Sequence, residues 1–385
     1  MKKIIRNFVV LLCAIVFCAN AFAYNFTVDG IYYNINADNV SVSVTYKTTN
    51  YNTYSGDVVI PSNVTYNGVN YAVTKIGDEA FRYCRNLTSV VIPNSITYIG
   101  AASFIGCKSL TSILIPNSVT YIGHSSFGRC EVLDSVIVPN SVTSIGEKAF
   151  YECLSLTYIS LPNSLTYLSE GMFKGCTSLV SIILPNSITI MEGHIFESCT
   201  NLNSVTIPEG VTSLGEWTFW NCSGLSSITI PMNVESIGDY SFSNCTSLNT
   251  IRCKGLEPPT LLSTVFTNVN KNNITLIVPC GKQSAYQQAE VWGLFNHIEE
   301  DCVGLNDVEK DNTISLYPNP AKESVSLNAE GDVIIYNNLG QTVKQVNNVK
   351  GNTTISVADL PKGTYYLKAG EKKQKLIIIR NFSTL

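Results

Sequence analysis

A repeat of 23 residues constrains this chain more than any other feature of its sequence. Phenylalanine recurs at this spacing, cysteine follows three residues later, leucine follows three residues after that, and proline recurs at the same period. Eight copies without an insertion predict a stack of similar structural units. The repeated positions are Phe81, Phe104, Phe127, Phe150, Phe173, Phe196, Phe219 and Phe242; Cys84, Cys107, Cys130, Cys153, Cys176, Cys199, Cys222 and Cys245; Leu87, Leu110, Leu133, Leu156, Leu179, Leu202, Leu225 and Leu248; and Pro93, Pro116, Pro139, Pro162, Pro185, Pro208 and Pro231.

One unit reads Phe-x-x-Cys-x-x-Leu-x-x-Ile-x-Ile-Pro-Asn-Ser-Val-Thr-x-Ile-Gly. Its segment from Leu110 to Ile115 predicts a strand with one buried face, which ends at proline because proline has no N–H to donate. A second extended piece follows from Val119 to Ile122, and Gly123 marks a turn. Phe and Cys then lie on a tight or 3₁₀-like return. One unit cannot bury its own apolar residues, so parallel coils about 4.8 Å apart must stack to do so.

Both ends of the array have features that predict caps. Upstream, alternating segments with a turn at Asp29-Gly30 indicate a β-rich cap, and Asn67-Gly68 predicts a hairpin inserted into the first repeat. Downstream, Ile274 to Pro279 predicts one more strand, and Ser284 to Val291 predicts a helix. Trp292, Phe295 and Ile298 should fold back over the last coil.

The C-terminal part has a different composition. About seven short strands are expected at regular spacing between Ile314 and Arg380, with turns at 338–340 and 361–363. This pattern predicts a small Ig-like β-sandwich. The expected fold class is therefore mainly β with short 3₁₀ or helical turns, a repeat solenoid with β-rich caps followed by that sandwich.

The start of the chain resembles a secretory signal. Lys2, Lys3 and Arg6 precede a short apolar run, and Ala21-Phe22-Ala23 fits a cleavage site. The formal charge of -4 becomes about -7 when these three cations are removed. No basic cluster remains, which argues against nucleic acid as a partner, and no second apolar segment predicts a membrane span in the mature chain.

Two resemblances to known families follow from these motifs. Tyr24 to Cys302, through Ile-Pro-Asn-Ser-Val-Thr-x-Ile-Gly and Phe-x-x-Cys-x-x-Leu, resembles the BspA-like leucine-rich repeats of bacterial surface proteins. Residues 314–380 resemble the type A C-terminal sorting domain of the type IX secretion system. The matching residues of that domain include Pro318, Asn319, Pro320, Gly340, Gly363 and Tyr365. The resemblances imply a Bacteroidota-type bacterium, passage across both membranes, interaction of 314–380 with the secretion machinery, and in several relatives adhesion.

The expected order along the chain follows from these features. It is a signal peptide at 1–23, an N-terminal β-cap at 24–58, a leucine-rich-repeat solenoid at 59–252, a C-terminal cap at 253–302, a linker at 303–313 and the sorting domain at 314–380.

The cysteines fall into two groups. Those in the repeat lie one per coil, so they cannot converge on a metal, and packing as small apolar groups is favoured over disulfides between coils. Cys280 and Cys302 lie 22 residues apart in the C-terminal cap of an exported protein. They predict a disulfide, with simple packing or pairing with Cys253 as alternatives.

Residues suited to catalysis do not cluster in the sequence. His124, His194 and His297 fall in different coils, and neither His-Glu-x-x-His nor Gly-x-Ser-x-Gly occurs. We therefore expect no enzyme activity, cofactor or metal. Trp217 and Trp220 flank Phe219, where a bulky variant of the repeat is favoured over a carbohydrate platform.

The outward positions of the first strand offer the best candidate binding surface. One column is small and polar and the other partly apolar, which marks either a contact site or ordinary β-propensity. The candidates are Ser89, Val91, Ser112, Leu114, Ser135, Ile137, Tyr158, Ser160, Ser181 and Ile183. Tyr98, Tyr121 and Tyr167 form a second stripe. The sequence thus predicts a non-catalytic surface adhesin or binding module for a host or partner-cell protein or glycan, or alternatively a structural, self-associating surface protein.

Overall fold

The computed structural model describes residues 23–49, 51–302, 314, 316–337, 341–370 and 372–378. These residues form two compact units, divided between residues 302 and 303. The predicted signal peptide, the linker at 303–313, Gly340 and the end of the chain from residue 379 lie outside the described residues, apart from Ala23. Among the described residues, no helix has the length and apolar character needed to cross a membrane.

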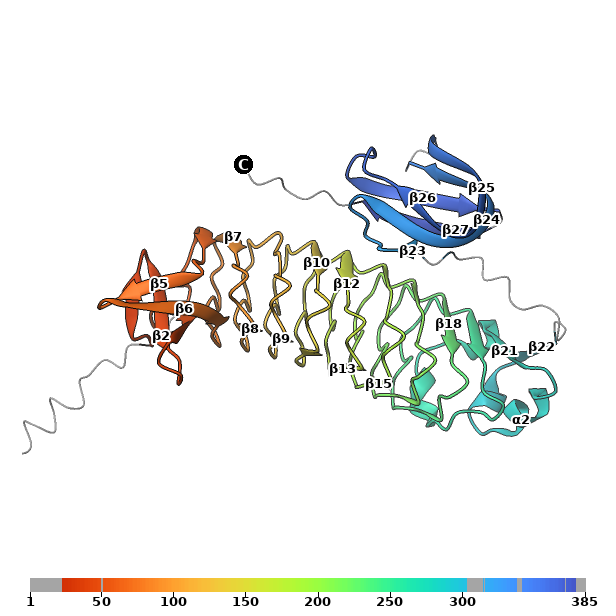
Figure 1. Ribbon diagram of the computed structural model, residues 1–385. Coiled ribbons are helices and arrows are strands. Elements are labelled where there is room, and N and C mark those ends of the chain that lie inside the picture. The colour runs from red at the N-terminus through yellow and green to blue at the C-terminus, as the bar shows by residue number, and fades with distance from the viewer. Residues whose placement is uncertain are drawn as a thin grey trace, which may run out of the picture. The chain divides into compact units, whose positions relative to one another are not determined.

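The first unit is a solenoid of parallel coils, which confirms the prediction from the repeat (Figure 1). Short strands of successive coils pair along one side, here called the first sheet. Single bridges join Ser112 to Ser135 and Thr206 to Thr229 where the ladder is interrupted. The strands are β4 (Gly56–Val59), β7 (Leu87–Val91), β10 (Ser135–Ile137), β12 (Tyr158–Ser160), β14 (Ser181–Ile182), β16 (Ser204–Val205), β18 (Ser227–Ile230), β20 (Thr250–Cys253), β21 (Thr275–Pro279) and β22 (His297–Asp301).

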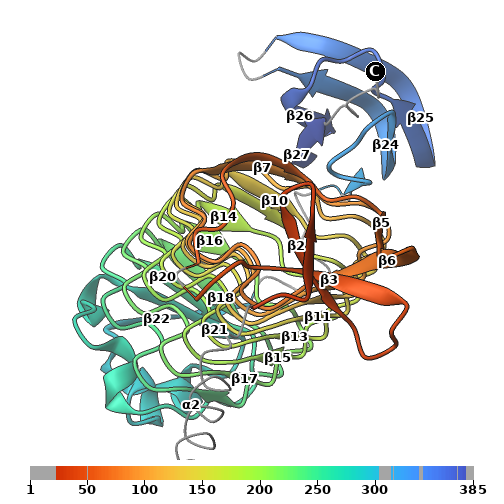
Figure 2. The same ribbon diagram turned by 90° about the vertical axis from the view of Figure 1, so that its left-hand side faces the viewer.

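A second row of parallel strands, here called the second sheet, lies after the proline corner of each coil. Figure 1 shows β8, β9, β13 and β15 along the edge opposite β7, β10 and β12, and Figure 2 looks along the stack. The strands are β8 (Tyr98–Ile99), β9 (Tyr121–Ile122), β11 (Ser144–Ile145), β13 (Tyr167–Leu168), β15 (Ile190–Met191), β17 (Ser213–Leu214) and β19 (Ser236–Ile237).

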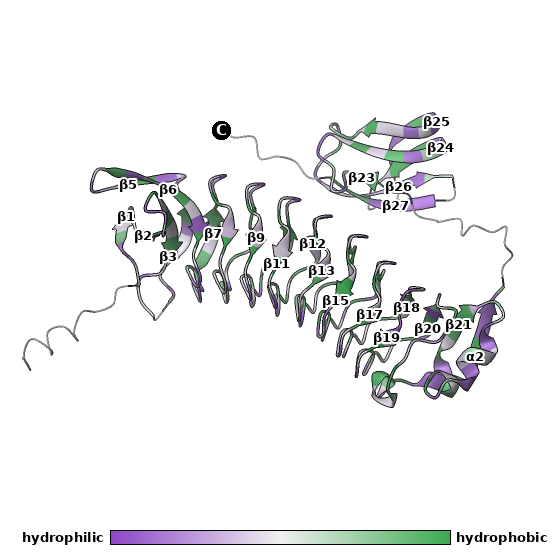
Figure 3. Cartoon of the chain, turned by 60° about the horizontal axis from the view of Figure 1, so that its bottom comes forward, coloured by the Kyte–Doolittle hydropathy of each residue, from purple (hydrophilic) through white to green (hydrophobic). Residues whose placement is uncertain are grey.

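The third side of each coil, here called the turn side, consists of consecutive turns around the repeated phenylalanine. The N–H of Phe104 donates to the carbonyl of Ser126 in the next coil, at 2.7 Å, and equivalent bonds recur along the stack. The phenylalanine rings stack inside with centroids 4.9 to 6.0 Å apart and planes within 3 to 13°. Figure 3 shows hydrophobic and hydrophilic stretches at the same place in successive coils. Stacking therefore buries what one coil cannot.

The stack extends further than the sequence repeat indicates. Tyr54 packs on Phe81 at one end, and Phe266 continues the phenylalanine stack at the other. β4 pairs in parallel with β7, with Val59 opposite Val91. The first coil thus begins at Gly56, inside the segment assigned to the N-terminal cap.

The N-terminal cap is built from antiparallel strands joined by the predicted turns. Asp29-Gly30 and Asn67-Gly68 connect their strands with φ values of 49 and 79° and of 50 and 80°, as two-residue hairpin turns require. The cap covers the apolar end of the first coil. Its strands are β1 (Phe26–Val28), β2 (Ile31–Ile35), β3 (Ser41–Thr45), β5 (Asn63–Tyr66) and β6 (Val69–Ile76), which also joins the second sheet.

The C-terminal cap closes the other end with short helices. Trp292 and Phe295 are almost fully buried against Phe266, and Trp292 Nε1 donates to the carbonyl of Pro259 at 2.8 Å. Ile298, partly buried, also packs against this core. The helices are η1 (Ser263–Phe266), η2 (Lys271–Asn273), α2 (Gln283–Gln288) and η3 (Trp292–Leu294).

The second unit is a small β domain with five described strands, fewer than the seven expected. β24 runs through two of the predicted strands, because Gly331 at φ 93° and a register shift let it bend without ending. The strands surround one core that includes Val325, Ile335 and Leu367. They are β23 (Leu316–Tyr317), β24 (Ser324–Tyr336), β25 (Thr342–Ser356), β26 (Gly363–Ala369) and β27 (Lys372–Ile378).

Candidate binding surfaces of the solenoid

The outer face of the first sheet carries a column of exposed apolar side chains. Exposed fractions are 55% for Val91, 78% for Leu114, 38% for Ile137 and 74% for Ile183. Val59, paired with Val91 and 65% exposed, extends this column by one coil. The sequence did not indicate Val59, because it stands in the irregular first repeat.

The companion column is polar and sits at the same depth. Ser112 and Ser181 are exposed, whereas the remaining predicted members, Ser89, Ser135 and Tyr158, are partly buried, as is Ser160 of the apolar column. Ser89 Oγ donates to Asp57 Oδ1 at 2.6 Å, and hydrogen bonds from Ser89 and Thr88 lower the pKa of that carboxyl. The ten predicted positions contain no charged residue. Together with Val59 they form what we call the uncharged strip.

The second sheet presents tyrosines. The rings of Tyr98 and Tyr121 stack with centroids 4.9 Å apart, and Tyr167 Oη lies 3.1 Å from Ser144 Oγ. Ser144 occupies the coil between Tyr121 and Tyr167. The stripe is therefore a stacked pair and a separate tyrosine.

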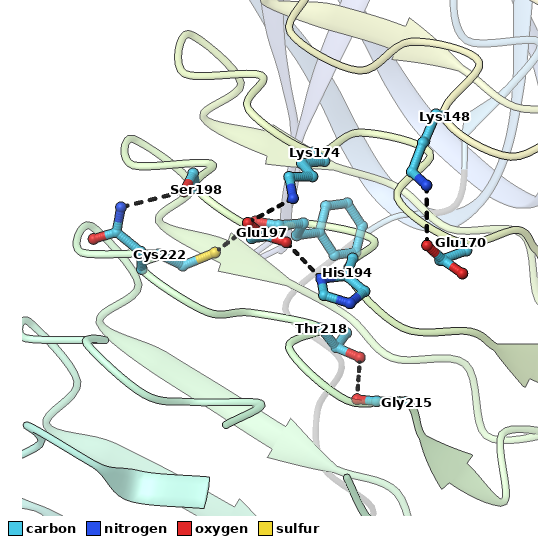
Figure 4. Close-up of polar contacts among 11 residues, drawn as sticks. Lys148, Glu170, Lys174, His194, Glu197, Ser198, Gly215, Thr218 and Cys222 are labelled. Carbon is cyan, nitrogen blue, oxygen red and sulfur yellow. Dashed lines mark hydrogen bonds and ion pairs between the residues drawn. The ribbon is translucent and has the colours of Figure 1, made fainter. Parts of the chain in front are cut away.

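The turn side carries charged residues paired between neighbouring coils. Arg129 Nε lies 2.9 Å from Glu152, Lys148 Nζ 3.1 Å from Glu170, and Lys174 Nζ 2.8 Å from Glu197 (Figure 4). Such exposed pairs contribute about 0 to 1 kcal/mol each. Their main effect is to neutralise charge on this side of the N-terminal coils.

The histidines make ion pairs in separate places. His194 Nδ1 lies 2.5 Å from Glu197 Oε2, and His124 Nδ1 lies 3.6 Å from Glu147. His297 lies at the start of β22. The three imidazoles thus lie in three different coils.

The cysteines of the repeat form a ladder of buried thiols. Each thiol from Cys107 to Cys245 donates to the carbonyl of the phenylalanine one coil earlier, at 3.1 to 3.2 Å. Burial raises the pKa of these thiols, to about 12 for Cys245 and also for Cys253. The nine free cysteines of the described chain are all buried, which disfavours the thiolate needed for oxidation or metal binding.

A disulfide joins Cys280 and Cys302 at the end of the β21–β22 pair. Glu300 lies beside it, and the three side chains could be taken for a metal-binding group. The sulfurs are bonded to each other, however, and offer no thiolate to a metal.

The motif residues of the second unit fix its first strand to its last. Asn319 Nδ2 donates to the carbonyl of Lys375 at 2.7 Å, and the N–H of Ile377 donates to Asn319 Oδ1 at 2.8 Å. The peptide bonds before Pro318 and Pro320 are cis. At the start of β26, which begins at Gly363, Tyr365 Oη donates to the carbonyl of Pro361 at 2.8 Å.

These features agree with the families that the sequence matches. Residues 74–192 and 169–282 match the BspA type leucine rich repeat region, described with six copies, and together cover more than half of the chain. The chain belongs to the BspA-type leucine-rich-repeat family. Residues 315–380 match the secretion system C-terminal sorting domain. This BspA-type chain is thus a cell-surface leucine-rich-repeat protein, exported to the surface or secreted, with a tail that implies handling by type IX secretion.

Solved structures share the fold. A leucine-rich repeat protein from Bacteroides ovatus ATCC 8483 is 28% identical, with a TM-score of 0.51 over 72% of this BspA-type chain and 76% of that chain. A leucine rich cell surface protein from Faecalibacterium prausnitzii A2-165 is 24% identical, with a TM-score of 0.42 over 72% and 94% of the two chains.

One curated enzyme matches a short stretch of the chain. Beta-agarase A of Zobellia galactanivorans is 41% identical over 73 residues, which are 18% of this chain and 14% of the enzyme. The chain spans about a seventh of that relative. The match therefore does not bear on the activity of this BspA-type protein.

Proposed function

We propose that this protein is a non-catalytic adhesin or binding module that holds an extracellular protein or glycan, of a host or a partner cell, on its first sheet. The observation that supports this most is the uncharged strip. Leu114 and Ile183 leave about three quarters of their side chains in water, at 78% and 74%. Contiguous exposed apolar groups on a soluble protein often mark a contact site.

The chemistry of the strip favours contact by apolar burial and hydroxyl hydrogen bonds. Covering apolar surface contributes about 25 cal/mol per Å², and serine hydroxyls can donate and accept without carrying charge. Binding should therefore depend little on ionic strength, because exposed charges are what salt screens.

The parallel backbone of the coils gives the strip a fixed geometry. Its side chains project from neighbouring strands in register, as Ser135 with Tyr158 and Ile137 with Ser160 show. A preorganised surface loses little conformational entropy on binding. This favours a surface receptor over a flexible tether.

We further propose that residues 314–380 engage the secretion machinery and that cleavage falls in the linker at 303–313. Removal of residues 1–23 would leave Tyr24 as the first residue. Mass spectrometry of the surface form is the test. A surface form that keeps its C-terminus would contradict the cleavage.

A matched pair of substitutions tests the strip. Ile183 and Ile190 lie in the same coil, on the first and second sheets, with exposed fractions of 74% and 57%. The full secreted chain is screened against extracellular-matrix proteins, mucins and a glycan array. Leu114→Asp and Ile183→Asp should weaken the binding found by about tenfold or more, and Ile190→Asp should leave it unchanged.

The alternative is a structural surface protein that binds copies of itself. Sedimentation of the purified chain at low and high salt separates the two. Salt-resistant self-association without saturable binding to any probe would overturn the adhesin proposal. Equal affinity of the folded Leu114→Asp, Ile183→Asp and unsubstituted chains would move the site away from the strip.

A further inference from the structure

Four aromatic side chains gather on the turn side of three consecutive coils: His194, Trp217, Trp220 and Tyr240. Trp217 stacks on His194 with centroids 5.9 Å apart and on Tyr240 at 4.6 Å. Trp220 lies 5.4 Å from Trp217 and is tilted by 56° to it. All four are partly exposed, whereas Trp292 is 1% exposed. We call these four residues the aromatic cluster.

The solenoid does not need aromatic residues at these positions. His194, Trp217 and Tyr240 occupy the repeat position two residues before the stacked phenylalanine. The equivalent residues of earlier coils are Glu79, Ala102, Ser125, Lys148 and Gly171, and all eight positions have φ between 51 and 61°. The coil therefore forms equally with alanine, serine or glycine there.

The aromatic residues are also unfavourable for the backbone that holds them. A left-handed φ suits glycine and small polar residues, whereas a bulky L-residue is strained there. Three bulky residues in successive coils carry a cost that the fold does not require. Backbone strain of this kind tends to be kept at functional sites.

Amide side chains stand in the same coils, two residues after the phenylalanine. Asn221 Nδ2 donates to Ser198 Oγ at 3.3 Å, and Asn268 Nδ2 donates to Asn244 Oδ1 at 2.9 Å. Each amide offers two N–H donors and a carbonyl acceptor, so these bonds leave groups free to bind a ligand. The aromatic cluster is thus combined with a column of neutral hydrogen-bonding groups.

The charge of these coils limits the ligand. Residues 175–251 contain no lysine or arginine and six carboxylates, at Glu192, Glu197, Glu209, Glu216, Glu235 and Asp239. The last cation before them, Lys174, is held by Glu197, which also binds His194 (Figure 4). An acidic ligand would meet repulsion without a cation to offset it.

We propose that the aromatic cluster binds a neutral oligosaccharide. The apolar C–H faces of sugar rings pack on aromatic rings, and their hydroxyls exchange hydrogen bonds with the amides. Because the pattern repeats from coil to coil, it suits a chain of sugar units better than a single sugar. The site lies on the turn side and is independent of the uncharged strip on the first sheet.

The chain itself supplies substitutions that its fold accepts. Trp217→Ala reproduces Ala102 at the equivalent position, and Trp220→Ser reproduces Ser243. Tyr151 occupies the same repeat position as Trp220 in an earlier coil, so Tyr151→Ser is the matched control. Since Trp292 is buried in the cap, fluorescence changes on binding report on Trp217 and Trp220.

The full chain is titrated with neutral hexaoses of glucose, mannose, xylose and N-acetylglucosamine, and with heparin. We expect a saturable change in tryptophan fluorescence with at least one neutral hexaose. Calorimetry should then show that Trp217→Ala with Trp220→Ser lowers the affinity by about tenfold or more. Tyr151→Ser and Ile183→Asp should retain it.

Three results would overturn the proposal: no saturable binding of any neutral hexaose, tighter binding of heparin, or equal affinity of the folded double variant. Circular dichroism and thermal unfolding establish that the variants are folded. If the double variant unfolds, the single Trp217→Ala variant carries the same test. Loss of binding at the uncharged strip would leave this result unaffected.

Discussion

The thiol of Cys130 donates a hydrogen bond to the carbonyl oxygen of Phe104, one coil earlier, at 3.2 Å. The N–H of Cys107 donates to the same oxygen at 3.1 Å. One carbonyl therefore receives a donor from its own coil and one from the next coil. This pairing gives cysteine a role that an apolar residue of the same size could not fill, since buried carbonyl groups are stabilised by each donor they gain.

A change at Cys153 tests that role. Its thiol donates to Phe127 at 3.1 Å. Cys153→Ala should lower the free energy of unfolding by about 1–3 kcal/mol through a lost donor and a small cavity. Cys153→Ser keeps a donor and should cost less. Urea denaturation of both variants gives the comparison, and equal stabilities would mean that only volume matters.

Alkaline pH should destabilise the solenoid. Burial raises the folded pKa of the thiols, to about 12 for Cys245 and Cys253, whereas the unfolded chain loses those protons near pH 8.5. The stabilisation is thus complete below about pH 8.5 and declines as pH rises towards the folded value. Each buried thiol adds about 1 kcal/mol per pH unit to the slope.

Unfolding by urea with a reductant present, between pH 7 and 9.5, measures this effect. Tyrosines titrate near pH 10 and add little in that range. A free energy of unfolding that stays constant up to pH 9.5 would argue against protonated thiols in the folded chain.

Gly128 and Tyr151 are coupled by close packing between coils. A Cβ atom added at Gly128 would overlap the ring of Tyr151, which lies under the Arg129 guanidinium at 5.5 Å. Gly128→Ala should therefore lower the unfolding free energy by about 1–3 kcal/mol. Adding Tyr151→Ala should restore part of that loss, as a double-mutant cycle would show. Strict additivity would rule out the coupling.

The disulfide should hold the end of the C-terminal cap. Cys280 and Cys302 enclose 22 residues of sequence separation, and closing a loop of this size contributes about 3 kcal/mol. Replacing both with serine should increase hydrogen exchange in β21 and β22 first. Unchanged exchange in these strands, measured by mass spectrometry, would show that Trp292 and Phe295 hold the cap without it.

Much of the solenoid could be predicted because its determinants are local or periodic. The spacing of Phe104 and Cys107 gives the coil, and the residues Asn67-Gly68 accept the left-handed angles of a hairpin turn. The outward position of Leu114 follows from the period of a strand. Each of these needs only neighbouring residues and the assumption of stacking.

Other features depend on contacts between residues distant in sequence. Phe266 continues the ring stack although its spacing departs from 23 residues, because the cap brings it onto Phe242. The thiol bond of Cys130 appears only when two coils are superposed. Trp217 is partly exposed since its neighbours are His194 and Tyr240, which the spacing alone does not reveal. In the second unit, the bend at Gly331 merges two expected strands into one.

The contacts of the phenylalanine stack and the thiol ladder join each coil to its immediate neighbours. A duplication or deletion of one complete coil would therefore recreate the same contacts on both sides of the junction, with no new core to design. The distance over which such a protein extends from a cell can change in steps of one coil, by recombination within a gene, while the chemistry displayed by each coil is altered separately.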